Sequence, residues 1–309
     1  MSISKYIKII GRGKEGARPL TREDAADLFG QVLDGSVTDL EVGGFCLAMR
    51  IKGETPEEMA GFLDATHQRL QHFPASNPSS KPIVVLPTYN GARKLPVLTP
   101  LLALLLAQRG LPVLVHGTPT ESSRVFASEV LVALDIPAQA ATKSIAPGEV
   151  VFAPTELLLP ALKRLLDVRR AVGLRNPAHS LVKILNPCHG KALVVSSYTH
   201  PEYAVAMGQT FELIKANALL LRGTEGEVVA DPRRMPQMEA FIEGIRQPAQ
   251  PAQTGTLAAL PELPKTTDAP TTAAYIRAVL AGEQQVPTPI ALQVEYILQV
   301  ASQLQLPQN

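Results

Sequence analysis

Short apolar runs alternate with helical segments from residue 83 to residue 221, and this alternation constrains the fold more than any other feature. The apolar runs lie at residues 83–86, 112–116, 150–153, 192–196 and 218–221. The helical segments between them lie at residues 95–108, 121–134, 156–168 and 201–216. Parallel strands need long connections, which are usually helical and cover both faces of the sheet. We therefore expect an α/β domain with a central, mostly parallel sheet flanked by helices.

The first 75 residues have a different, helical pattern. Thr21 precedes an apolar helical face, and Thr55 with Glu58 has the spacing of a capping box at the start of another helix. Residues 74–82 are rich in proline, serine and asparagine, which favours a linker. We therefore predict a small helical domain at residues 1–75 and a larger α/β domain at residues 76–309. The larger domain should end in a loop at 247–264 and helices at 271–281 and 289–304.

Positive charge is unevenly distributed, although the net charge is only +1. Six basic residues and one acid lie between Lys5 and Arg22, and seven basic residues and one acid lie between Lys163 and Lys191. Such runs can attract polyanions, although a single charge run is usually just a solvated surface. The chain has no tryptophan and few other aromatic residues, which argues against large stacking platforms for single strands.

The two cysteines, Cys46 and Cys188, are far apart and lack the spacing of a metal site. With no secretory signal at the start of the sequence, this usage indicates free thiols in a reducing cytoplasm. The longest apolar run, residues 98–107, is too short to cross a membrane. We therefore expect a cytoplasmic protein without a membrane partner.

Four strings together point to a known family. Residues 44–55 read Gly-Phe-Cys-Leu-Ala-Met-Arg-Ile-Lys-Gly-Glu-Thr, and further strings are Val115-His116-Gly117, Gly173-Leu174-Arg175 and Asn186-Pro187. They resemble the second helix, a strand end and the hinge of anthranilate and nucleoside phosphoribosyltransferases. The resemblance covers nearly the whole chain. It implies a helical domain that forms a homodimer, an α/β domain, and a hinge segment at residues 168–187 that returns toward the helical domain.

The catalytic motifs of that family are replaced in this chain. Active members bind phosphoribosyl pyrophosphate with a Gly-Thr-Gly-Gly-Asp loop after the first strand, but residues 87–94 here read Pro-Thr-Tyr-Asn-Gly-Ala-Arg-Lys. Proline lacks an N–H, and tyrosine and asparagine add bulk where a phosphate needs bare backbone. The family's magnesium-binding Asp-Glu pair is replaced by Val228 and Val229, which cannot bind a hard cation. We therefore expect no catalytic residues, no metal and no cofactor.

The replacement strings resemble the YbiB-type branch of this family. They occupy residues 11–14, 86–94, 98–103, 175–179, 200–203 and 222–228. YbiB-type proteins are described as DNA-binding, so the resemblance implies binding to the phosphate backbone of DNA or RNA. We expect little sequence specificity, because the chain has no motif for a helix that reads bases.

Basic and polar residues are the candidates for phosphate contacts. They are Arg12, Lys14, Arg18, Arg22, Asn90, Arg93, Lys94, Arg169, Arg170, Arg175 and Lys183. The first four would form a flexible arm beside Gly11 and Gly13, and the last four would form the wall of a basic groove. The resemblance matches Arg175 to the family arginine that binds the carboxylate of the aromatic acid. Each group also has a structural alternative. The first four could be a solvated segment, Arg93 and Lys94 could cap the following helix, and Arg175 could be a hinge residue.

A residual phosphate site is a further hypothesis, with His116, Gly117, Ser122 and Ser123 as its candidates. The serines match a helix start in the family and could equally be ordinary N-caps, and His116 could be a hydrogen-bonded structural residue. Two other functions stay open for the whole chain. One is a phosphoribosyltransferase acting on anthranilate or a related acceptor, and the other is a non-catalytic binder of a phosphorylated metabolite. The preference among single-stranded DNA, duplex DNA and RNA is also open.

Overall fold

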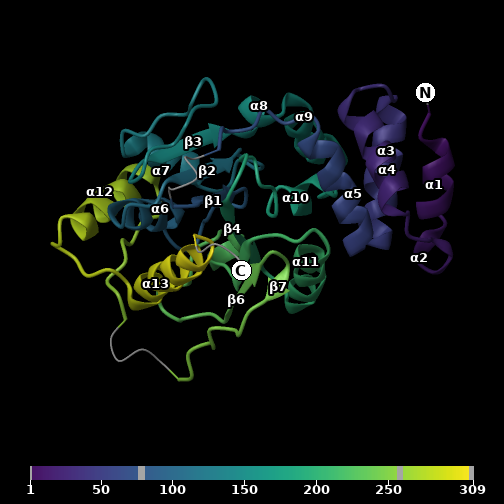
Figure 1. The fold of residues 1–309 in the computed structure, drawn as a ribbon. Coiled ribbons are helices and arrows are strands. Elements are labelled where there is room, and N and C mark those ends of the chain that lie inside the picture. Colours follow the sequence, from purple (N-terminus) through teal and green to yellow (C-terminus); the bar gives the residue numbers. More distant parts are fainter. Residues whose placement is uncertain (1, 76–80, 256–259, 306–309) are drawn as a thin grey trace.

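The computed structural model describes residues 2–75, 81–255 and 260–305, and it has two parts (Figure 1). A group of helices lies at one end of the molecule, and a sheet covered by helices forms the rest. This is the predicted fold class, a small N-terminal helical domain followed by an α/β domain with a mostly parallel sheet.

The N-terminal helices are α1 (Ser4–Ile10), α2 (Gly13–Gly16), α3 (Arg22–Leu33), α4 (Asp39–Lys52) and α5 (Pro56–His67). Thr21 accepts a hydrogen bond from the N–H of Asp24 at the start of α3, and Thr55 forms the predicted capping box with Glu58 at the start of α5. Three phenylalanine rings from α3, α4 and α5 stack or meet edge to face in the core between these helices. The arm expected from Arg12 to Arg22 is partly helical, because it contains α2 and ends at the first residue of α3. Tyr6 and Ile10, just before it, are buried against this core.

The sheet has seven strands in the order β3-β2-β1-β4-β5-β6-β7. The strands are β1 (Ile83–Thr88), β2 (Val113–Gly117), β3 (Val150–Pro154), β4 (Ala192–Tyr198), β5 (Ala218–Arg222), β6 (Met238–Ile242) and β7 (Ile245–Arg246). The first five are parallel, as predicted, and their carboxyl ends lie at one edge of the sheet. The last two are antiparallel additions that the sequence pattern did not predict.

Helices cover the sheet on two sides (Figure 1). On one side lie α6 (Thr99–Gln108), α7 (Ala127–Ala133), α12 (Ala269–Leu280) and α13 (Thr288–Gln303). On the side of the helical domain lie α9 (Pro160–Val172), α10 (Ala178–Leu181) and α11 (Pro201–Leu213), and the short α8 (Thr155–Leu158) follows β3. Leu162, Leu165 and Leu181 belong to the same apolar core as α3, α4 and α5. The segment around residues 160–182 thus returns to the helical domain. The proposed boundary between residues 75 and 76 borders residues 76–80, which lie outside the described part.

Several predicted helices begin or end elsewhere. The helix expected from residue 121 begins at Ala127, because Val125 forms an antiparallel bridge with Ala92 and Glu129 accepts from the N–H of Phe126. The helix expected at 156–168 is divided before Pro160, which starts α9. None of the helices in the described ranges combines the length and the apolar character that a membrane span requires. Both cysteines are buried and free.

Candidate anion-binding site

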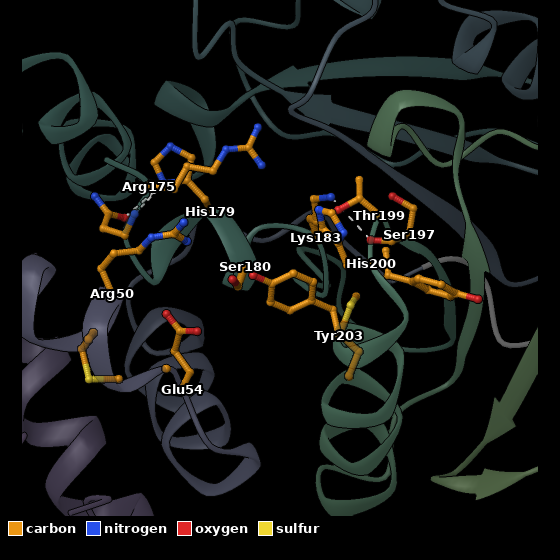
Figure 2. A pocket seen from close by; sticks show the side chains of 15 residues that line it. Arg50, Glu54, Arg175, His179, Ser180, Lys183, Ser197, Thr199, His200 and Tyr203 are labelled. Atoms are coloured by element: carbon orange, nitrogen blue, oxygen red, sulfur yellow. Dashed lines mark hydrogen bonds between the residues drawn. The ribbon is translucent and has the colours of Figure 1, made fainter. Parts of the chain in front are cut away.

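A cavity of about 300 Å³ lies between the helical domain and the α/β domain (Figure 2). We call it the interdomain cavity. Its walls come from the end of α4, the connection from α9 to α10, the end of β4 and the first turns of α11. It is lined by Met49, Arg50, Gly53, Glu54, Arg175, Asn176, His179, Ser180, Lys183, Ser197, Tyr198, Thr199, His200, Tyr203 and Met207.

Three cations line this cavity without a carboxylate partner. Arg50 comes from the last turn of α4, Arg175 from the connection between α9 and α10, and Lys183 from just after α10. In the described part of the chain, none of the three makes a salt bridge. The Lys183 ammonium donates only to backbone carbonyls, at 3.3 Å from the oxygen of Gly226 and 3.5 Å from that of Ser197. The cavity therefore has positive charge that an anion would balance.

Burial changes the pKa values of the groups around these cations. Burial, with a smaller contribution from nearby Arg175, lowers the pKa of Lys183 to about 8, so the ammonium is still mainly charged at neutral pH. Burial also lowers the pKa of His179 to about 3, so its ring is neutral there. Glu54, the carboxylate that lines the cavity, has its pKa raised by burial. The Nε2 atom of His179 is buried and has no hydrogen-bond partner among the described residues.

The loop after β1 is already occupied by a carboxylate of the chain itself. Glu227 is fully buried, and its side chain accepts hydrogen bonds from the backbone N–H groups of Asn90 and Gly91 at 2.9 and 2.8 Å. It also accepts from the hydroxyls of Thr88 and Thr99. The N–H groups that could have bound a phosphate at this strand end therefore already hold an anion.

A second carboxylate occupies the next part of the same loop. Glu225 accepts from the consecutive N–H groups of Arg93, Lys94 and Leu95 at 2.9–3.3 Å. Arg124 lies 3.6 Å from the other side of this carboxylate. The backbone of Glu225 has a φ of 51°, a conformation that is unusual for a residue with a side chain. We refer to residues 87–95 with these two carboxylates as the filled loop.

Several residues of the predicted sites cannot reach a ligand. Asn90 is buried, and its amide donates to the carbonyl of Glu225. His116 is fully buried against the hydroxyl of Tyr89, at 2.9 Å from Nδ1, and a side chain at Gly117 would collide with the carbonyl of Thr88. Buried His116 therefore has no surface on which a phosphate could bind. The structure supports the alternative of a structural histidine.

The serines of the predicted residual phosphate site lie elsewhere. Ser122 and Ser123 are exposed in a turn before α7, so they are neither its N-caps nor part of a helix N-terminus. Ser122 instead lines a separate depression with Arg169 and Arg170. Val228 and Val229 are buried in the apolar core beside the sheet.

Of the basic residues predicted to contact phosphate, some pair with carboxylates, some are exposed, and two line the interdomain cavity. Three of them pair with carboxylates, Arg22 with Asp64, Arg169 with Glu121 and Arg170 with Asp167. Four have exposed side chains away from the interdomain cavity lining, namely Arg12, Arg18, Arg93 and Lys94. The side chain of Lys14 lies outside the described residues. Arg175 and Lys183 line the interdomain cavity, whereas Arg169 and Arg170 pair with carboxylates and line a separate depression.

Sequence reasoning missed Arg50 and the aromatic residues of the cavity. Arg50 lies inside the string that indicated the family, and His200 and Tyr203 lie inside the string at residues 200–203. These strings were informative about ancestry, but nothing in them showed that they meet in one cavity.

The fold is that of the anthranilate phosphoribosyltransferases. The structure of anthranilate phosphoribosyltransferase (TrpD) from Thermus thermophilus superimposes with a TM-score of 0.76, covering 97% of this chain and 91% of that chain, at 23% sequence identity. The yeast enzyme from Saccharomyces cerevisiae, in complex with PRPP and Mg, superimposes with a TM-score of 0.70 at 14% identity and covers 97% of this chain and 88% of that chain. Residues 4–69 match the family model described as the helical bundle domain of a glycosyl transferase family.

The relatives narrow this class to one family. The uncharacterized protein YbiB of Escherichia coli K12 is 40% identical over 302 residues, which cover 95% of this chain and 92% of YbiB. An anthranilate phosphoribosyltransferase of Methanopyrus kandleri is 29% identical over 223 residues, which cover 67% of this chain and 62% of that enzyme. The chain belongs to the YbiB family, which is homologous to anthranilate phosphoribosyltransferases.

Proposed function

We propose that this protein binds nucleic acid through phosphates at the interdomain cavity and does not transfer phosphoribosyl groups. The observation that carries the proposal is the set of unpaired cations Arg50, Arg175 and Lys183 in one cavity. Backbone phosphates bind such groups by charge-assisted hydrogen bonds. The exposed cations Arg93 and Lys94, on the filled loop, and Arg12 and Arg18, in the helical domain, would add phosphate contacts outside the cavity. Two buried free thiols fit the cytoplasmic location that we also propose.

The filled loop is the main argument against the enzymatic alternative. Pyrophosphate could use the N–H groups of residues 90, 91 and 93–95 only by displacing Glu225 and Glu227. Glu227 is buried, so its displacement would leave a charged group without its partners. Binding of a small phosphorylated metabolite uses the same cations as nucleic acid. The two functions must therefore be separated by experiment.

Fluorescence anisotropy of a labelled oligonucleotide across a salt series tests the proposal. Affinity should fall steeply with salt, by about a thousandfold between 50 and 200 mM if roughly six phosphates are bound. Phosphoribosyl pyrophosphate with magnesium, added at the same phosphate concentration as the oligonucleotide, should not compete for binding. No binding at low salt would refute the nucleic-acid function. Equal competition by small phosphates, without a response to longer oligonucleotides, would instead indicate a metabolite binder.

We also propose that the protein is a homodimer that pairs through α4. This helix presents Leu40, Leu47 and Ile51 to solvent, with exposed fractions of 86%, 42% and 62%. With Gly44, they follow the spacing i, i+4, i+7 and i+11, so they form one apolar stripe along the helix. A second copy of the same helix would cover the stripe.

Charge placed on this stripe should separate the dimer. The double substitution Leu47→Glu and Ile51→Glu should change the mass measured by size-exclusion chromatography with light scattering from that of a dimer to that of a monomer. Both side chains are exposed within one protomer, so the fold should persist, as circular dichroism would show. The control is Val132→Glu on α7, an equally apolar exposed position that should leave the mass unchanged. An unchanged mass for the double variant would place the dimer contact elsewhere.

A further inference from the structure

The few aromatic side chains of this protein are not scattered over its surface. The chain has eight phenylalanines and six tyrosines, all within the described residues. All the phenylalanines and four of the tyrosines (Tyr6, Tyr89, Tyr275 and Tyr296) are buried. The other two tyrosines, Tyr198 and Tyr203, both line the interdomain cavity. Every phenylalanine or tyrosine ring that solvent can reach thus lies at the interdomain cavity.

Tyr203 is the more exposed of the two and has no evident structural role. It projects from the first turn of α11 into the cavity, and 43% of its surface is exposed (Figure 2). Its hydroxyl makes no hydrogen bond to any described residue, and its nearest aromatic neighbour is the tilted ring of His200 at 6.1 Å. An exposed apolar ring next to a polar cavity leaves a face free for a ligand.

The cations of the same cavity indicate which ligand fits this face. Arg50, Arg175 and Lys183 surround the cavity into which Tyr203 points (Figure 2). Cations that follow a phosphate backbone beside rings that accept bases are the combination that binds single strands. Duplex bases are already paired and stacked, so they cannot lie flat on a protein ring without being opened.

We infer that the protein prefers single-stranded over duplex nucleic acid because an unpaired base stacks on Tyr203 while flanking phosphates contact Lys183 and Arg175. The inference rests on the proposed nucleic-acid function and specifies its substrate. It requires one stacking position only, so it is compatible with the low aromatic content of the chain. Stacking does not read base identity, which agrees with binding of little sequence specificity.

The test compares three ligands that carry the same number of phosphates in the labelled strand. These are an oligothymidylate, an abasic strand of equal length, and a duplex containing the oligothymidylate. Wild-type protein should bind the oligothymidylate best. Tyr203→Ala should weaken that binding roughly tenfold and change abasic and duplex binding by less than twofold. Tyr203→Phe should retain wild-type affinity, because it keeps the ring.

A matched control lies on the same helix. Val205 is 60% exposed on α11, and Val205→Ala should leave all three affinities unchanged. The salt dependence of Tyr203→Ala should equal that of the wild type, since no phosphate contact is removed. The inference is overturned if Tyr203→Ala lowers the affinity for all three ligands equally, or lowers the affinity for none of them. If the wild type binds no ligand at low salt, the proposed function itself fails.

Discussion

Replacing Glu227 with alanine should lower the free energy of unfolding by about 3–5 kcal/mol. The substitution removes the acceptor for two backbone N–H groups and for the hydroxyls of Thr88 and Thr99, all inside the buried part of the filled loop. The hydroxyls can rotate and water can enter, so the loss is smaller than the sum of four separate bonds. Urea denaturation followed by circular dichroism measures it as a shift of the midpoint.

Glu225→Ala is the matched control for this prediction. It removes an acceptor from three N–H groups of the same loop, but these lie near the surface, where water can replace the carboxylate. The expected cost is about 1 kcal/mol. Glu225→Gly should cost less, because glycine adopts the unusual backbone conformation of this position without strain. Equal stability of Glu227→Ala and wild type would show that the buried carboxylate does not hold the loop.

Replacing Lys183 with methionine should stabilise the protein and weaken its binding to nucleic acid. At neutral pH the charged ammonium is buried without a carboxylate partner, and burial lowers its pKa from 10.5 to about 8. A shift of this size corresponds to a cost of roughly 3 kcal/mol, which the methionine avoids. Loss of one phosphate contact should weaken binding to oligonucleotides of every sequence. It should also reduce the slope of log affinity against log salt concentration by about 1.

The pH dependence of the stability gained by Lys183→Met shows whether the gain comes from removing a buried charge or from better packing. The unfolded chain retains the Lys183 proton up to about pH 10.5, whereas the folded protein releases it near pH 8. Wild-type stability therefore rises between these values, because the unfolded state binds more protons there. The advantage of Lys183→Met should be full below pH 8 and disappear by about pH 10.5.

Urea midpoints of variant and wild type at pH 7, 8, 9 and 10 measure this difference. The control Lys143→Met changes an exposed lysine that pairs with Glu149 far from the cavity, so both stability and nucleic-acid binding should change little. A gain for Lys183→Met that is constant with pH would mean that packing causes it. No gain at pH 7 would mean that the ammonium is better solvated than its position indicates.

Most of the fold was predictable because its signals are local. Each parallel strand is a short apolar run, and Thr55 with Glu58 marks a helix start within four residues. Strand β6 was missed because Met238–Ile242 is short and contains Glu239, so its pattern resembles the loop around it. The start of α7 was misplaced because Val125 is held extended by Ala92, a contact across 33 positions.

The site was predictable only in part, because its contacts are distant in sequence. Arg175 and Lys183 were expected together and line one cavity. Arg169 was expected beside them but pairs with Glu121, which is 48 positions away, whereas the partner of Arg170, Asp167, was only one helical turn away and could have been noticed. The contacts of Glu227 span 128–139 positions, and no local pattern indicates them.

The filled loop would make the loss of phosphoribosyl transfer that we propose difficult to reverse. Glycines restored at residues 87–91 would place a pyrophosphate against carboxylates that come from a separate segment, residues 225–227. Removal of Glu227 alone would first destabilise the protein, since the donors that it accepts from would lose their acceptor. Binding of pyrophosphate at this loop would need coordinated changes in both segments, and each change made separately is unfavourable. The proposed loss of the transfer reaction would therefore be easier than its return.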